Sequence, residues 1–334
     1  MSAPPLLMAS LWVLSASAST WGSSPAPSPP LQATPPASSD RMLRAFAFLR
    51  GGRAAQAEAL FREALAADPR NGQARLGLAL ALAAQERLAE ALPAFEEAAR
   101  RLPDLADAHF NLGVALEKVG RLEEAERALR RATALQPSHA AAAFNLGVVR
   151  GRLGRDEEAI TAYTAAVKAR PDNAEAWANL GTSYGRLGRM DEARAAFERA
   201  VAARPQHVEA AYGLAWTLGR LGRFGEAAIA YERTLALDPT HVPALIGYGV
   251  ALGSLGRYNK AVNAFREALR LAPDQTDAFH GLGLNLYNLR RWPEAVAALE
   301  RASALRPEDV GLARAFEDEY QRVRANALAP AARR

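Results

Sequence analysis

Asparagine recurs in this chain at a fixed spacing of 34 residues, at Asn111, Asn145 and Asn179. An amide side chain carries hydrogen-bond donors and an acceptor, so a row of amides on one surface can follow the backbone of an extended peptide. The alternative is that each amide hydrogen-bonds the end of a neighbouring helix. The spacing alone favours neither role.

Basic residues follow the same spacing in a second row, which consists of Lys118, Arg152, Arg186 and Arg220. Such a row suits an acidic peptide or a C-terminal carboxylate. The alternative is a set of solvated cations near helix C-termini, where the helix dipole favours positive charge. Tyr212 and Trp216 lie one helical turn apart, and a tryptophan outside the core is a good anchor for a binding partner.

Catalytic motifs are scarce by comparison. The sequence contains no HExxH metal motif, no phosphate loop and no GxGxxG turn. It has no cysteine, which excludes disulfides, thiolate catalysis and thiolate metal ligands. Three histidines, His139, His207 and His241, follow a proline by two residues and are expected to be structural. We therefore expect no enzyme, no cofactor and no metal site.

The elements that carry these rows also repeat every 34 residues. Proline closes each of eight units, at Pro69, Pro103, Pro137, Pro171, Pro205, Pro239, Pro273 and Pro307. Each unit has two apolar stretches with helical spacing and a short break between them, which predicts a pair of antiparallel helices. In most units the break contains glycine, such as Gly154 or Gly188, which enters a left-handed conformation at low cost. One such hairpin cannot bury its apolar faces, so the units are expected to stack.

The fifth unit carries the pattern most fully. It reads Trp177-x2-Leu180-Gly181-x2-Tyr184, then Ala193-x3-Phe197, then Pro205. This pattern resembles the tetratricopeptide repeat (TPR). The resemblance implies an all-α fold, a right-handed superhelical solenoid of antiparallel helix pairs over residues 38–309. The implied repeats are 38–71, 72–105, 106–139, 140–173, 174–207, 208–241, 242–275 and 276–309.

In the TPR family the first helix of each repeat lines a concave groove, and the resemblance therefore implies which residues face a ligand. The implied peptide-binding groove consists of Phe110, Asn111, Val114, Lys118, Phe144, Asn145, Val148, Arg152, Asn179, Thr182, Arg186, Tyr212, Trp216 and Arg220. Tyr212 and Trp216 are expected in the groove because Leu214 and Leu218 already supply the core stripe. Arg150 stands where other units place leucine or tyrosine, so its charge must reach solvent or a carboxylate.

The expected partner is a protein or peptide, and the basic row suggests an acidic one. The carboxylate clamp of TPR co-chaperones is not expected, because Leu76, Leu80 and Ala141 stand where the clamp needs amides or cations around Asn111. A net charge of +5 is weak support for an anionic partner. Nucleic acid is not expected, because acidic residues closely follow the turn arginines, as Glu192 follows Arg189.

The two ends of the chain differ from the repeats. Leu6 to Leu14 is an apolar run too short for a transmembrane helix, and Ala16-x-Ala18 suits cleavage after Ala18. We expect a signal peptide over residues 1–18, and hence a periplasmic or secreted protein, which we expect to be bacterial. The alternative is a plain leader on a cytoplasmic protein. It stays open because no lysine or arginine precedes the apolar run, whereas signal peptides usually have a positively charged start.

Three further segments flank the repeats. Residues 19–37 are rich in proline and serine and are expected to form a disordered linker. Residues 310–326 are expected to form a capping helix that buries Leu312, Phe316 and Tyr320, followed by a frayed tail over residues 327–334.

These features together predict a non-catalytic scaffold that binds an extended peptide or a helix in its concave groove. One alternative is a structural subunit of a cell-envelope or secretion assembly, which would use the outer surface and the leader. Another is an accessory arm of a glycosyltransferase, since the asparagine row resembles one in the repeat arms of O-linked N-acetylglucosamine transferases.

Overall fold

The computed structural model describes residues 36–305 and, beyond them, residues 318, 321–323 and 325. All regular secondary structure in this part of the chain is helical, which confirms the predicted all-α class. The predicted signal peptide, nearly all of the predicted linker and the tail lie outside the described residues. The chain divides into two compact units with a boundary between Val119 and Gly120.

The N-terminal unit is a run of antiparallel helices, each packed against the next. Its helices are α1 (Pro36–Arg50), α2 (Ala54–Ala67), α3 (Gly72–Ala84), α4 (Leu88–Arg101) and α5 (Ala106–Lys118). Phe61 and Phe95 are fully buried between them. Gly77 allows this close packing, because a Cβ atom there would lie 2.3 Å from the Phe61 ring.

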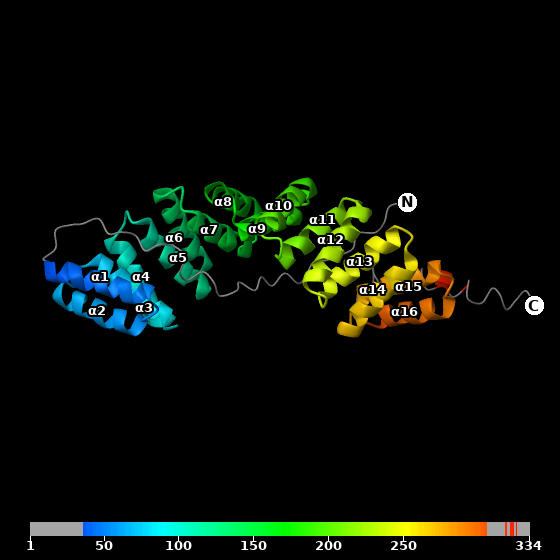
Figure 1. Ribbon diagram of the computed structural model, residues 1–334, viewed down its shortest axis with the longest axis horizontal. Helices are drawn as coiled ribbons and strands as arrows, with labels where there is room; N and C mark the ends of the chain where they lie inside the picture. Colours follow the sequence, from blue (N-terminus) through cyan, green and yellow to red (C-terminus); the bar gives the residue numbers. More distant parts are fainter. Residues whose placement is uncertain (1–35, 306–317, 319–320, 324, 326–334) are drawn as a thin grey trace, which may run out of the picture. The chain divides into compact units, whose positions relative to one another are not determined.

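The C-terminal unit continues the same pattern, with hairpins that follow one another side by side in Figure 1. Its helices are α6 (Leu122–Leu135), α7 (Ala140–Arg152), α8 (Asp156–Ala169), α9 (Ala174–Arg186), α10 (Met190–Ala203), α11 (Val208–Arg220), α12 (Phe224–Leu237), α13 (Val242–Ser254), α14 (Tyr258–Leu271), α15 (Thr276–Asn288) and α16 (Trp292–Leu305). Alanines and one large side chain per second helix, such as Tyr163 or Phe197, fill the space within and between hairpins.

The first helices of successive hairpins in the C-terminal unit touch one another. Contacts join α7 to α9, α9 to α11, α11 to α13 and α13 to α15, whereas the described second helices lack comparable contacts with each other. A stack whose members approach on one side and separate on the other curves toward the approaching side. We call the face formed by α7, α9, α11, α13 and α15 the inner wall.

The turns inside the hairpins explain why the units are alike. Gly120, Gly154, Gly188, Gly222 and Gly256 all adopt positive φ angles between 72° and 79°. Two units lack this glycine, yet Glu86 (φ 62°) and Arg290 (φ 59°) take the same left-handed conformation. A side chain there costs roughly 1 to 2 kcal/mol, so packing of the flanking helices dictates the turn.

The turns between hairpins are fixed by side-chain caps. Nδ1 of His139, His207 and His241 accepts a hydrogen bond from the backbone N–H three residues later, at 3.1, 3.4 and 3.1 Å. Asn71 and Asn173 cap α3 and α9 in the same manner. The prediction that these histidines are structural is confirmed, because each one satisfies an N–H group at a helix start.

Part of the predicted capping segment is visible after α16. Val323 is fully buried in the same apolar cluster as Leu282 and Leu286 of α15. The three residues predicted to form its buried stripe, Leu312, Phe316 and Tyr320, lie outside the described residues.

Candidate binding surface

The predicted groove residues of the C-terminal unit lie on the first helices that form the inner wall. Half-buried side chains there include Phe144 and Val148 of α7, Thr182 of α9 and Trp216 of α11. Phe110, Asn111, Val114 and Lys118 lie on α5 of the N-terminal unit. Val114 is 5% exposed and belongs to the core there, so it presents little surface to a ligand.

The three asparagines make hydrogen bonds within the fold. Asn111 Nδ2 donates to the carbonyl of Asp107 at 2.7 Å, and Asn145 Nδ2 donates to that of Ala141 at 2.9 Å. Both acceptors lie four residues earlier on the same helix. Asn179 instead hydrogen-bonds the hydroxyl of the buried Tyr163. These bonds do not reach a neighbouring helix end, so that predicted role is wrong for Asn111 and Asn145. The peptide-binding role stays a prediction.

The predicted basic row is only partly available to a ligand. Arg186 contacts Asp156 at 3.4 Å. Lys118 and Arg152 are exposed but also interact within the protein. The guanidinium of Arg220 lies 5.5 Å from the centroid of the Trp216 ring, within cation–π range, and forms no ion pair with a carboxylate among the residues that the structure describes.

Tyr212 corrects the sequence prediction, because it belongs to the core and not to the groove. Only 7% of its surface is exposed, and its ring lies 4.7 Å from that of His241 and 6.2 Å from that of Tyr231. Burial raises the pKa of its hydroxyl to about 12. Leu214, which was predicted to take this core position, is only half-buried.

Trp216 remains on the wall, one turn after Tyr212. Its six-membered ring lies against Gly185 of α9, where a Cβ atom would approach the ring to 3.4 Å. The ring thus contacts both the backbone of the preceding first helix and the guanidinium of Arg220. A half-buried tryptophan whose ring already contacts its neighbours is pre-organised for binding, because little rotamer entropy is lost on contact.

Arg150 forms a buried ion pair that links two hairpins. Its Nε lies 3.1 Å from Glu126 of α6, and Arg155 contacts the other oxygen of that carboxylate at 2.7 Å. The side chains of Arg150 and Glu126 are only 14% and 12% exposed. The prediction that Arg150 needs solvent or a carboxylate is confirmed, and its role is structural.

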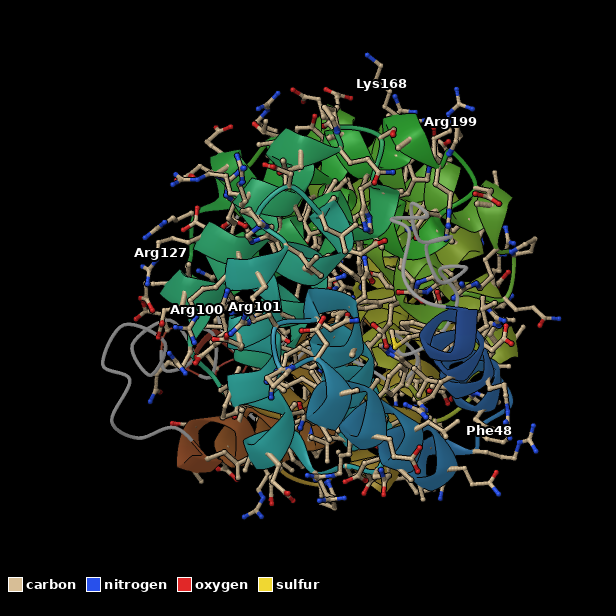
Figure 2. All side chains as sticks on the ribbon, turned by 90° about the vertical axis from the view of Figure 1, so that its left-hand side faces the viewer. Phe48, Arg100, Arg101, Arg127, Lys168 and Arg199 are labelled. Carbon is tan, nitrogen blue, oxygen red and sulfur yellow. The ribbon has the colours of Figure 1, made fainter. Side chains whose placement is uncertain are left out.

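Most of the turn arginines pair with carboxylates. Arg121, Arg189 and Arg223 each pair with the glutamate three residues later at 2.6 to 2.9 Å. Arg257 has Lys260 at that place, and the two line an open cavity of about 320 Å³ with Leu289. This cavity lies at the turn before α14 and not on the inner wall. Figure 2 shows Lys168 and Arg199 pointing away from the second helices α8 and α10.

The sequence predicts no GxSxG nucleophile elbow, although one pentapeptide, Gly181-Thr182-Ser183-Tyr184-Gly185, matches the GxSxG pattern of hydrolases. That motif works only at a sharp turn between a strand and a helix, where the serine is exposed. Here the segment lies inside α9, and Ser183 is 2% exposed. The match therefore has no catalytic meaning in this fold.

Burial shifts the pKa of three titratable groups in the C-terminal unit. Burial lowers the pKa of His280 on α15 to about 4 and raises the pKa of Tyr163 and Tyr231 well above the usual value. The described residues contain no group of three or more His, Asp or Glu side chains that could hold a metal ion. None of the described helices is both long and apolar enough to span a bilayer.

Comparison with protein families decides what the hairpins are. A tetratricopeptide-repeat model matches residues 43–106, 87–127, 110–174, 149–203 and 178–242, and a second TPR model matches residues 249–290. The chain belongs to the tetratricopeptide-repeat family. Repeats of this family form interaction surfaces, so this TPR chain carries a protein-binding fold.

Solved TPR structures resemble parts of the chain. YrrB is described as a TPR protein with an unusual peptide-binding site, and its sequence is 26% identical to this one. The alignment covers 56% of this chain and 96% of the YrrB chain, with a TM-score of 0.52. PilF of Pseudomonas aeruginosa is 20% identical, covers 66% of this chain and 96% of its own, with a TM-score of 0.53. MamA is 25% identical, covers 50% and 97%, and has a TM-score of 0.47. No curated protein matches the chain.

Proposed function

We propose that this TPR protein is a non-catalytic scaffold that holds a segment of another protein against the inner wall of its C-terminal unit. The observation that supports the proposal best is Trp216, a half-buried aromatic side chain that stays on the wall while Tyr212 is buried. Tryptophan and arginine are the side chains that most often dominate binding energy at interfaces. Trp216 and Arg220 supply both on a single helix turn.

Similarity to YrrB supports a peptide as the class of partner. YrrB is described as having an unusual peptide-binding site, and it aligns with just over half of this chain. A wall of parallel helices offers side chains at regular intervals, which suits an extended segment or one helix laid across several repeats. Arg152 and Arg220 on the wall favour a segment with acidic residues.

The experiment is capture of partners from the native host with the tagged full-length chain. Trp216→Ala should lose the captured protein, whereas Ile229→Ala on α12 should keep it. Ile229 is the matched control, because it is a large apolar side chain, 69% exposed, on a second helix away from the wall. Equal capture by the two variants would contradict the proposal.

A second candidate is a subunit of a cell-envelope or secretion assembly that binds through its second helices. The exposure of Ile229 favours it, because an isoleucine so exposed on a helix invites apolar contact. In that case Ile229→Ala loses the partner and Trp216→Ala keeps it. A glycosyltransferase arm is less favoured, because the asparagine row that suggested it donates hydrogen bonds within the fold.

Location in the periplasm or outside the cell is part of the same proposal and rests on the apolar run and the Ala16-x-Ala18 site. N-terminal sequencing of the protein purified from its host tests it. A mature chain that starts at Ser19 supports export, and a chain that starts at residue 1 or 2 contradicts it.

A further inference from the structure

The turn between α13 and α14 carries two cations beside a cavity. Arg257 and Lys260 are exposed, and neither forms an ion pair with a carboxylate among the residues that the structure describes. Together with Tyr258, Asn259 and Leu289 they line the open cavity of about 320 Å³. Like charges that lie three residues apart at the start of one helix repel each other, so the pair lowers the stability of this turn.

The equivalent turns of the C-terminal unit show which group such an arginine binds. The arginine at the same place in every other hairpin of this unit contacts a carboxylate, namely Arg121, Arg155, Arg189, Arg223 and Arg291. Arg121, Arg223 and Arg291 donate from Nε and Nη2 to the two oxygens of one glutamate, at 2.6 to 2.8 Å. Two parallel hydrogen bonds of this kind fit the planar guanidinium to a planar carboxylate.

Two differences in sequence remove the carboxylates that Arg257 would meet in another hairpin. Most turns supply the glutamate three residues after the arginine, where this turn has Lys260. Arg155 instead contacts Glu126 of the preceding second helix at 2.7 Å, and the equivalent residue on α12 is Ala228. Arg257 thus keeps the position of a carboxylate-binding arginine, while a second cation stands where its carboxylate would be.

The cavity also has an apolar part. Tyr258 and Leu289 line it and are half-buried, and Leu255, two residues before Arg257, is exposed. A volume of about 320 Å³ is at the lower end of ligand pockets, which suits one or two side chains better than a cofactor. Two cations beside exposed apolar groups are complementary to an acidic residue that has an apolar neighbour.

We propose that this cavity binds the carboxylate of an Asp or Glu side chain from a partner peptide. Arg257 holds the two carboxylate oxygens as its equivalents hold their own glutamates, and Lys260 adds a second positive charge. Tyr258 and Leu289 contact the apolar residue next to the acidic one. The site lies outside the inner wall, so it goes beyond the proposed function and does not depend on Trp216.

One substitution restores the internal pair and thereby blocks the site. Lys260→Glu places a glutamate three residues after Arg257, as in the other turns, so it should pair with the guanidinium and raise the Tm by about 2 °C. Lys168→Glu is the matched control. Lys168 is an exposed lysine in the last turn of α8, has no ion pair within the described part of the chain, and undergoes the same change of charge. Its substitution should not raise the Tm.

NMR spectroscopy of the full chain with isotope-labelled arginine measures binding at the Nε–H group of Arg257, which Arg257→Lys assigns. The probes are acetyl-Gly-Leu-Glu-Gly-amide, acetyl-Gly-Leu-Gln-Gly-amide and inorganic phosphate. The Glu peptide should shift the Arg257 signal in the wild type and in Lys168→Glu, with an affinity roughly fivefold or more above that of the Gln peptide. In Lys260→Glu it should leave the signal unchanged.

Equal affinity for the two peptides, or an undiminished response in Lys260→Glu, would overturn the site. Tighter binding of phosphate than of the Glu peptide would show that the ligand is a phosphate group and that the carboxylate assignment is wrong. Failure of this test leaves the proposed function standing, because the wall is tested separately by the loss of the captured partner in Trp216→Ala.

Discussion

Two stretches of the inner wall use their polar residues in different ways. On α7 and α9, Asn145 bonds its own helix, Asn179 bonds Tyr163, and Arg186 contacts Asp156. On α11, Trp216 and Arg220 contact each other, and Arg220 pairs with no carboxylate in the described part of the chain. The regular residues hold the hairpins together, whereas the residues that break the pattern are the ones left to contact a partner.

The largest expected effect is on α11. Trp216→Ala should weaken binding of the captured partner by roughly 2 to 4 kcal/mol, or about thirty- to a thousandfold, because buried tryptophans dominate interface energies. The double variant Asn145→Ala with Asn179→Ala should change affinity less than threefold. Isothermal titration calorimetry with the captured partner measures both. A larger loss of affinity in the double asparagine variant than in Trp216→Ala would show that α7 and α9, and not α11, contact the partner.

Glu126 tests the structural role of the polar groups on α7. Glu126→Ala leaves the largely buried Arg150 with Glu158, at 3.3 Å, as its remaining carboxylate and should cost about 1 to 2 kcal/mol of unfolding free energy. Replacing Arg150 with leucine in the same chain should restore most of this loss, since leucine occupies that position in other repeats. Urea denaturation of the three variants gives the values. If Glu126→Ala were as stable as the wild type, water would solvate the Arg150 charge as well as Glu126 does, and the structural role of the pair would be wrong.

The stability of the protein should depend on pH through His280 on α15. Burial lowers the pKa of His280 on α15 to about 4, below its ordinary value of 6.5, so the unfolded chain binds the proton more readily. Stability therefore falls as pH falls through this window, by about 2 kcal/mol between pH 7 and pH 5. His280→Gln should lessen this dependence in Tm measurements. An unchanged pH slope would show that the imidazole is accessible to water.

The smallest effect separates the two asparagines. Asn179→Ala removes the partner of a buried tyrosine hydroxyl and should cost about 1 kcal/mol, whereas Asn145→Ala removes a bond within its own helix and should cost less. Hydrogen exchange at the amides of α8 and α9 resolves this difference. If both substitutions left the exchange rates unchanged, Asn179 would have no structural role. It would then remain a candidate for contact with the ligand.

The sequence predicted the hairpins well because their causes are local and repeated. Three local signals fix most of the hairpins: a left-handed residue at the inner turn, a proline at the end of the unit, and a histidine or asparagine cap at the next helix start. In each case the interacting groups lie within a few residues of one another. The pairing of Arg150 was also foreseeable, since a buried charge requires a counter-charge.

The site was harder to predict because it depends on contacts between repeats. Tyr212 was assigned to the groove from its position, but it packs against Tyr231 and His241 of other elements. The amide rotamers of Asn111 and Asn145 are set by nearby carbonyls on the same helix. The contact of the Trp216 ring with Gly185 appears only when α9 and α11 are placed side by side.

Photo-crosslinking in the native host tests the central claim most directly. A benzophenone amino acid replaces Val250 on the inner wall in one strain and Ile229 on α12 in another. The account predicts that irradiation links a partner protein to the Val250 position and not to the Ile229 position. A partner linked only from Ile229 would contradict it.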